Sequence, residues 1–315
     1  LIQGGLVAGF LLAGCAVLFA RRAGIVLIHA GVGLLMFGQF YVGKYDVEEQ
    51  MTIAEGGTAN YAHDIRRVEL AVIDRNAPDF PDEEVVVSVP LSKNGKPTRL
   101  QKLTPIRHVD LPFDIEVIKF FQNSSVEPLP PGHSNPATAG KGRMVVAKQV
   151  RANSGADSGG GVDLASAYIR FNDPVKNEDL GTYLLSQVQL RPRDGMPMVS
   201  FDETVEVGGR AYEVVLRFER QYKPYSFELL DFRKEDYLGT TKAKSYTSRV
   251  RLVDKDRKTD REVTIWMNNP MRYAGETFYQ SSWGMDAGKI YSVLQVVKNG
   301  GWMIPYVACM FVAVG

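Results

Sequence analysis

The sequence predicts a membrane protein, with transmembrane α-helices and a large, mainly antiparallel β domain, a sandwich or open barrel of one or two lobes. Three stretches contain no Asp, Glu, Lys or Arg: 1–20, 23–43 and 301–315. Arg21 and Arg22 lie between the first two. All 36 acidic residues and all but those two of the 37 basic residues lie within 44–300. The net charge of +1 excludes a strongly basic nucleic-acid-binding protein.

The three uncharged stretches are predicted to be membrane segments. A helix needs about 20 apolar residues to cross a hydrocarbon core of about 30 Å. Segment 23–43 meets this requirement, and segment 1–20 fits a span better than a signal peptide, since a second span follows at once. Segment 301–315 is too short, so we interpret the sequence as a fragment cut within helices at the C-terminus and at the N-terminus.

The loop between the first two spans predicts the orientation. It consists of Arg21 and Arg22, and short Arg-rich loops remain cytoplasmic. The second span then runs outward and places 44–300 on the extracytoplasmic, periplasmic side of the cytoplasmic (inner) membrane, in a multi-pass arrangement. Aromatic residues at the expected bilayer boundary support this topology: Phe40, Tyr41, Tyr45, Trp302 and Tyr306.

Small residues recur along both N-terminal spans. Their spacing is four on the first span and seven on the second, and it allows close helix packing. The ordinary glycine content of membrane helices explains them equally well. The residues are Gly5, Gly9 and Ala13, then Gly24, Gly31 and Gly38.

Cys15 and Cys309 are the only cysteines, and both lie in apolar segments. The domain at 44–300 therefore has no disulfide, no C-x-x-C exchange motif and no C-x-x-C-H site for covalent haem. No Cys/His set has the spacing of a zinc site.

Strand-like runs dominate from residue 66 onward, and several alternate apolar and polar residues. Asn94-Gly95 and Gly208-Gly209 are typical of hairpin turns. The predicted strands are 66–74, 83–89, 114–121, 143–150, 163–171, 183–190, 210–218, 246–254, 262–267 and 289–297.

Two polar stretches, 123–142 and 152–161, are rich in Pro, Gly and Ser and are predicted to be mobile loops. The region 123–162 is then the expected separation between two lobes.

Enzyme motifs are missing: there is no H-E-x-x-H, no G-x-S-x-G and no complete P-loop. His63 with Asp64, or His108 with Asp110, could form an acid–base pair of a membrane-anchored hydrolase. Exposed loop histidines are the favoured interpretation, and His133 falls in the Pro/Gly-rich stretch.

His29 is the only Asp, Glu, Lys, Arg or His residue within the three apolar segments, which marks it as a candidate functional residue. Neutral imidazole is a good haem-iron ligand. Gly33 follows one turn later and leaves room for a flat cofactor or a neighbouring helix. Met36 cannot be the second axial ligand, because one straight helix cannot reach both faces of a haem. Alternatively, His29 only hydrogen-bonds across helices.

Several stretches resemble the ResB family of cytochrome c biogenesis proteins. They are 222–240, 248–254, and 267–284 with its Asn-Pro pair, its Gly and its Phe-Tyr-Gln-Ser-Ser run. The early segment also matches, with His29 two positions before Gly31.

The resemblance implies a subunit of the system II cytochrome c maturation complex, which binds haem b and carries it across the membrane for attachment to apocytochrome c. It implies that His29 is an axial ligand of the haem iron and that a CcsA/ResC-type membrane partner supplies the second ligand. The chain is then an accessory subunit and not an enzyme alone. The alternative is an extracytoplasmic scaffold that binds no haem. The motif residues are expected to be mainly structural: Asn269, Pro270, Gly275, Tyr279 and Gln280.

Overall fold

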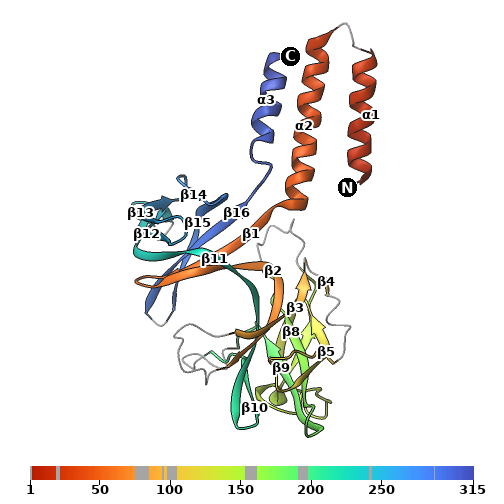
Figure 1. Ribbon diagram of the computed structural model, residues 1–315, viewed down its shortest axis with the longest axis vertical. Helices are drawn as coiled ribbons and strands as arrows, with labels where there is room; N and C mark the ends of the chain where they lie inside the picture. Colours follow the sequence, from red (N-terminus) through yellow and green to blue (C-terminus); the bar gives the residue numbers. More distant parts are fainter. Residues whose placement is uncertain are drawn as a thin grey trace. The chain divides into compact units, whose positions relative to one another are not determined.

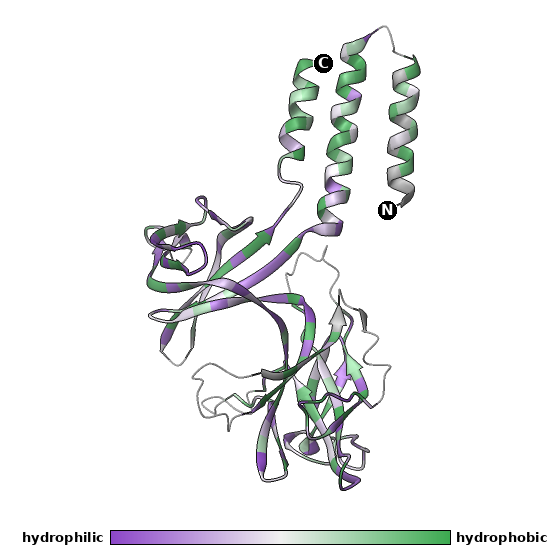
Figure 2. Ribbon diagram, viewed as in Figure 1, coloured by the Kyte–Doolittle hydropathy of each residue, from purple (hydrophilic) through white to green (hydrophobic). Residues whose placement is uncertain are grey.

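The computed structural model contains three helices: α1 (Ile2–Leu18), α2 (Ala23–Tyr45) and α3 (Ile304–Val314) (Figure 1). It describes residues 2–18, 22–74, 85–93, 96–97, 105–152, 162–190, 198–240, 243–286 and 288–315. Among these residues, α2 is the one helix long and apolar enough to cross a membrane. Figure 2 shows all three helices as mainly hydrophobic, whereas the strands mix both kinds of residue.

The rest of the described chain is mainly β-structure, as the sequence predicts. The strands are β1 (Val47–Ala54), β2 (Thr58–Asp74), β3 (Val85–Lys93), β4 (Lys96–Pro97), β5 (Asp114–Phe121), β6 (Ser124–Pro128), β7 (Val145–Gln149), β8 (Ser166–Asp173), β9 (Glu178–Ser186), β10 (Glu203–Val207), β11 (Arg210–Asp236), β12 (Ala243–Asp254), β13 (Thr259–Trp266), β14 (Met271–Tyr273), β15 (Glu276–Asp286) and β16 (Lys289–Lys298). The ladders β1–β16, β11–β12, β12–β13 and β15–β16 are antiparallel.

The chain forms two units. Unit 1 comprises Leu1–Ala62 and Tyr222–Gly315, and unit 2 comprises His63–Gln221. The boundaries fall within the long strands β2 and β11.

Unit 1 contains the helices and an antiparallel sheet in which β16 lies between β1 and β15. Alternation along the strands places Phe227, Phe278 and Leu294 on one buried face. The rings of Phe227 and Phe278 lie 4.8 Å apart. A backbone bridge between Trp266 and Asn269 links the end of β13 to the residues just before β14.

Unit 2 contains the three-stranded sheet β5–β8–β9, the pair β6–β7 and the hairpin of β10 with the first part of β11. Aromatic rings fill its core, with Phe113 edge-on to Phe171 at 5.2 Å and to Tyr212 at 5.6 Å. Gly208 and Gly209 form the two-residue β10–β11 turn with φ values of 60° and 79°, as predicted. The predicted turn at Asn94-Gly95 lies outside the described residues.

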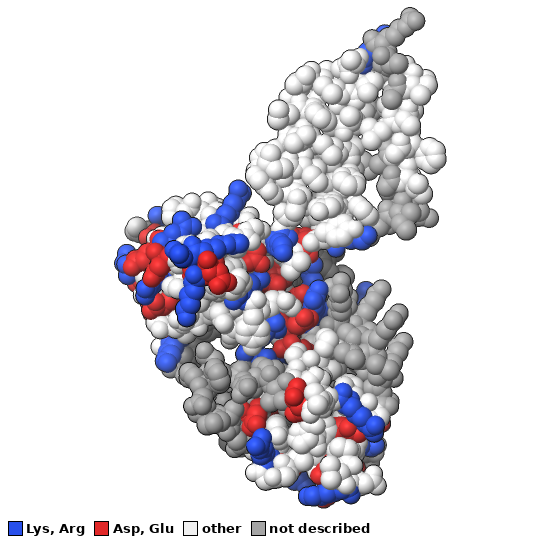
Figure 3. All heavy atoms as spheres, viewed as in Figure 1, with Lys and Arg blue, Asp and Glu red and all other residues white. Residues whose placement is uncertain are grey.

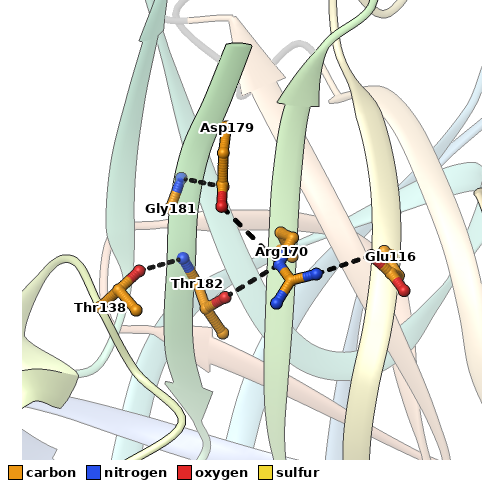
Figure 4. A network of polar contacts seen from close by, with 6 residues as sticks. All are labelled: Glu116, Thr138, Arg170, Asp179, Gly181 and Thr182. Atoms are coloured by element: carbon orange, nitrogen blue, oxygen red, sulfur yellow. Dashed lines mark hydrogen bonds and ion pairs between the residues drawn. The ribbon is translucent and has the colours of Figure 1, made fainter. Parts of the chain in front are cut away.

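A polar row crosses the three-stranded sheet of unit 2 (Figure 4). Arg170 of β8 lies 3.4 Å from Glu116 of β5 and 4.0 Å from Asp179. Arg170 pairs directly with Glu116 and Thr182 across the sheet, so this row is a set of cross-strand pairs. These charged side chains are partly or largely exposed, so we assign the row no site.

The predicted lobe separation at 123–162 is wrong, because its described residues lie inside unit 2. The stretch 123–142 is not simply a loop either. It contains β6, and its Asn135 amide donates to the carbonyl oxygens of Gly142, Arg143 and Val145 at 2.9–3.1 Å. A side chain that satisfies three backbone acceptors orders a segment whose composition predicts a mobile loop. The predicted loop at 152–161 lies almost wholly outside the described residues.

Candidate functional site

Three glycines of α2 form the contact with α3. A Cβ atom at Gly31 would lie 2.6 Å from Val312 Cγ2 and 2.7 Å from the Ala308 carbonyl oxygen. Gly24 is similarly close to Gly315, and Gly38 to Ile304. The seven-residue glycine repeat is therefore a packing surface, which decides between the two interpretations of the sequence.

Gly33 lies against α1 instead. A Cβ atom there would meet Leu12 Cδ1 at 2.7 Å. Of the two uses that the sequence suggests for this space, the neighbouring helix is the one found. Gly9 of α1, in contrast, has no atom within 4 Å of its Cβ position in the described structure, so no packing contact is found at this member of the small-residue series.

His29 lies half-buried on α2, one turn after Ile25. Its Nδ1 atom donates a hydrogen bond to the Ile25 carbonyl oxygen at 2.8 Å. A carbonyl can only accept, so the proton is on Nδ1, and in the neutral ring Nε2 carries a lone pair. This bond stays within α2, and the described side chains show no bond from His29 to another helix.

The surroundings of His29 limit where the second axial ligand implied by the family resemblance could come from. Successive helical residues turn by about 100°, so His29 lies about 160° around α2 from Gly31 and from the α3 contact. Met303, Cys309 and Met310 of α3 have sulfur atoms that could bind iron, but α3 packs on the other side of α2 from His29. Val32 and Met36, on the same side as His29, are 47% and 54% exposed. α1 covers this side of α2 at Gly33, and the rest of it, around Val32 and Met36, is exposed. No group of three or more His, Cys, Asp and Glu that could hold a metal ion occurs among the described residues.

The motif at 267–284 contains β14 and most of β15, which form a hairpin in unit 1. Ala274 and Gly275 make the two-residue turn, with φ values of 52° and 83°. Glycine suits this left-handed conformation, and the structural role predicted for Gly275 is confirmed. Pro270 directly precedes β14.

Gln280 joins three strands within the core of unit 1. Its Oε1 accepts a hydrogen bond from Ser248 Oγ at 2.7 Å, and its Nε2 donates to Ser292 Oγ at 3.1 Å and to the Ser282 carbonyl at 3.0 Å. The side chains of Ser248 and Ser292 are completely buried. Gln280 is thus a core residue, whereas the neighbouring Tyr279 is exposed.

A buried charge cluster, absent from the sequence predictions, lies beside this hairpin. Lys223 Nζ donates to Glu49 at 2.6 Å and to Glu276 at 2.7 Å, and the Tyr225 hydroxyl donates to the second oxygen of Glu276. Burial lowers the pKa of Lys223, but the bonds to Glu276 and Glu49 outweigh it and raise the pKa overall. Burial, followed by the bond to Glu276, raises the pKa of Tyr225. Nothing in the spacing of these residues indicates the cluster, because the fold brings them together.

The remaining histidines form no catalytic arrangement that supports a hydrolase. His108 lies 3.4 Å from Asp110, both are exposed, and no serine bonds to this pair in the described part of the chain. His133 is exposed, as predicted, and lies 3.4 Å from the Pro131 carbonyl oxygen. His63 was predicted to lie in a loop; it lies in β2 and is half-buried, so that prediction is wrong.

An apolar helix long enough to cross a membrane, followed by antiparallel β units, defines a membrane-associated β protein. Figure 3 shows charged side chains spread over the β units and nearly missing from the helices. Residues 194–307 match the ResB-like family. This match includes the motif at 267–284 and agrees, over that region, with the resemblance to the ResB family of cytochrome c biogenesis proteins.

Two curated relatives are similar to short stretches of the chain. Protein NrfI of Wolinella succinogenes is 43% identical over 63 residues, which is 20% of this chain and 7% of NrfI. The chloroplastic cytochrome c biogenesis protein CCS1 of Oryza sativa subsp. japonica is 38% identical over 65 residues, 21% of this chain and 10% of CCS1. The chain therefore matches a tenth or less of the length of these relatives.

Proposed function

We propose that this chain is a subunit of a system II cytochrome c maturation complex and that His29 holds haem during its passage through the membrane. The match of residues 194–307 to the ResB-like family and the similarity to CCS1, whose name gives a cytochrome c biogenesis role, support this function. Haem is the cargo, the group that such a complex attaches to apocytochrome c.

The observation that carries the proposal is the hydrogen bond from His29 Nδ1 to the Ile25 carbonyl oxygen. A histidine ligand characteristically donates its second ring N–H to a backbone carbonyl or a carboxylate, which fixes its tautomer and ring orientation. Here the helix itself supplies that acceptor. His29 therefore fits a haem b axial ligand that coordinates iron through Nε2.

The second ligand comes, in this proposal, from a membrane partner of the CcsA/ResC type. α3 packs on the opposite side of α2, and Met36 is on the same helix as His29. The side of α2 with the exposed Val32 and Met36 is where such a partner would pack and complete the site. The β units would face the extracytoplasmic side, where apocytochrome c is matured.

One observation favours the alternative, a scaffold that binds no haem. Leu12 of α1 already fills the space at Gly33, so haem would have to approach His29 elsewhere on its exposed side. In the scaffold function, the β units bind the partner or apocytochrome c and His29 is dispensable.

The experiment is a maturation assay with the full-length protein and its partner complex. His29→Ala is expected to lower haem content and covalently matured cytochrome c, while the matched control His133→Ala, in an exposed loop, leaves both unchanged. Normal maturation and haem content in His29→Ala would contradict the proposal and favour the scaffold.

A further inference from the structure

A cavity of about 340 Å³ lies on the outer face of the β14–β15 hairpin in unit 1. Register pairs Arg272 with Thr277, and Thr277 with Val297. Side chains alternate between the faces of a sheet, so these residues lie opposite the buried Phe278. Asn299 and Trp302, which follow β16, line the cavity as well.

The cavity lies where α2 would leave the bilayer. A Cβ atom at Gly301, next to Trp302, would be 3.1 Å from both Tyr41 and Val42 in the last turns of α2. Trp302 is half-exposed, and its ring contacts Tyr306 in α3 at 6.3 Å. Tryptophan and tyrosine are typical of the membrane–water interface.

The cavity carries an uncompensated positive charge. The Arg272 guanidinium lies 5.1 Å from the centre of the Trp302 ring, and no carboxylate in the described residues forms an ion pair with it. The one carboxylate that lines the cavity is Glu276, and both of its oxygens are already bonded, one to Lys223 and the other to Tyr225. An arginine stacked on an indole at a polar–apolar boundary is suited to an anionic ligand.

The other polar groups of the cavity offer donors as well. Asn299 Oδ1 accepts a hydrogen bond from the Gly301 N–H at 2.7 Å, which leaves the Asn299 amide nitrogen as a donor. Tyr279 and Thr277, whose side chains carry hydroxyl groups, also line the cavity. Several donors around one cation fit a ligand whose oxygens only accept, and Val297 with the Trp302 ring fits an apolar part of the same ligand.

We propose that this cavity binds the phosphate head group of an anionic phospholipid at the bilayer boundary. The inference goes beyond the proposed function: it requires that α2 is inserted in a membrane but does not require haem. The bound lipid would hold the β14–β15 hairpin of the family motif against the membrane surface.

Native mass spectrometry of the full chain, purified in neutral detergent, tests the proposal. The probe is an equimolar mixture of phosphatidylglycerol and phosphatidylcholine. We expect the wild-type chain to bind phosphatidylglycerol selectively. In Arg272→Gln the affinity for phosphatidylglycerol should fall about tenfold, because one charge-assisted hydrogen bond is removed. Arg261→Gln, an exposed arginine of β13 that does not line the cavity, is the matched control and should bind like wild type.

Equal binding by wild type and Arg272→Gln, or an equal loss in Arg261→Gln, overturns the proposal. Asn299→Asp is the second variant, because a carboxylate can keep the bond to Gly301 N–H while it repels phosphate. It should also lose selectivity, and unchanged selectivity overturns the proposal.

Further arms identify the source of the anion. Displacement of the lipid by an equal concentration of inorganic phosphate would assign the cavity to free phosphate and overturn the lipid proposal. Loss of haem in Arg272→Gln would instead assign it to a haem propionate. His29→Ala should retain wild-type lipid selectivity, so failure of the haem function and failure of the lipid site remain distinguishable.

Discussion

His29 Nδ1 donates to the Ile25 carbonyl oxygen at 2.8 Å, one turn earlier in the same helix. This bond fixes which ring nitrogen carries the proton and leaves Nε2 able to coordinate a metal. Because the acceptor is a backbone group of α2, the arrangement depends only on the helix being formed. In the proposed function, His29 would therefore be oriented before a partner or haem binds.

The α2–α3 contact gives the first prediction. Gly31→Ala should lower the stability of the helix pair by about 1–3 kcal/mol, since its Cβ would overlap the Ala308 carbonyl oxygen at 2.7 Å. Gly43→Ala, in the same helix with no atom near its Cβ position, should be neutral or slightly stabilising. Thermal unfolding in detergent measures both. Equal melting temperatures for the two variants would contradict the packing role of Gly31.

The network around Gln280 gives the second prediction. Gln280→Ala leaves the buried hydroxyls of Ser248 and Ser292 without their amide partner, at an expected cost of about 1–3 kcal/mol in the free energy of unfolding. Ser281→Ala, at the exposed neighbouring position, is the control and should change it by less than about 0.5 kcal/mol. Urea titration measures the free energy of unfolding of both variants. If Gln280→Ala lowers it no more than Ser281→Ala does, the network contributes little to stability.

The buried charge cluster predicts a dependence on alkaline pH. The pKa values of Lys223 and Tyr225 are raised in the folded state, so the unfolded chain loses these protons first. Their contribution to stability is complete below pH 10 and falls as the pH rises above the unfolded values of 10.5 and 10.0. Unfolding free energies measured between pH 8 and 11 should decline less steeply in Tyr225→Phe than in wild type. Identical slopes would contradict this cause.

The orientation of the β units gives a fourth prediction. Val175 in unit 2 is 90% exposed, and the natural cysteines lie in α1 and α3. A membrane-impermeant maleimide should therefore label Val175→Cys in intact spheroplasts. If Val175→Cys is labelled only after the membranes are disrupted, the β units lie in the cytoplasm, which contradicts the prediction. The wild-type chain is the control, because any labelling of it comes from the natural cysteines Cys15 and Cys309.

Much of the β-structure was predictable, because alternating apolar and polar residues indicate a half-buried strand. The run at 114–121 is β5, and Gly208-Gly209 forms the turn expected of it. β1 was not predicted, because Glu48 and Glu49 interrupt its pattern. In the fold Glu49 is buried, and Lys223 bonds to its carboxylate. That partner is 174 positions away and invisible to any local pattern.

The candidate site was predicted in part for a similar reason. A histidine in an apolar segment can be recognised from sequence alone, and so can a glycine repeat. The partner of each glycine cannot, because the α2–α3 contact depends on a helix that follows the whole β region. The cavity beside Arg272 also depends on folding, since β14, β15 and the residues after β16 meet there only in the sheet.

The most direct test of the central claim is an absorption spectrum of the full-length protein, purified in detergent with its membrane partner, as wild type and as His29→Ala. The proposed axial ligation predicts a Soret band that weakens or shifts in His29→Ala and recovers when imidazole is added. An unchanged band in His29→Ala would contradict it and would assign haem binding to the partner alone.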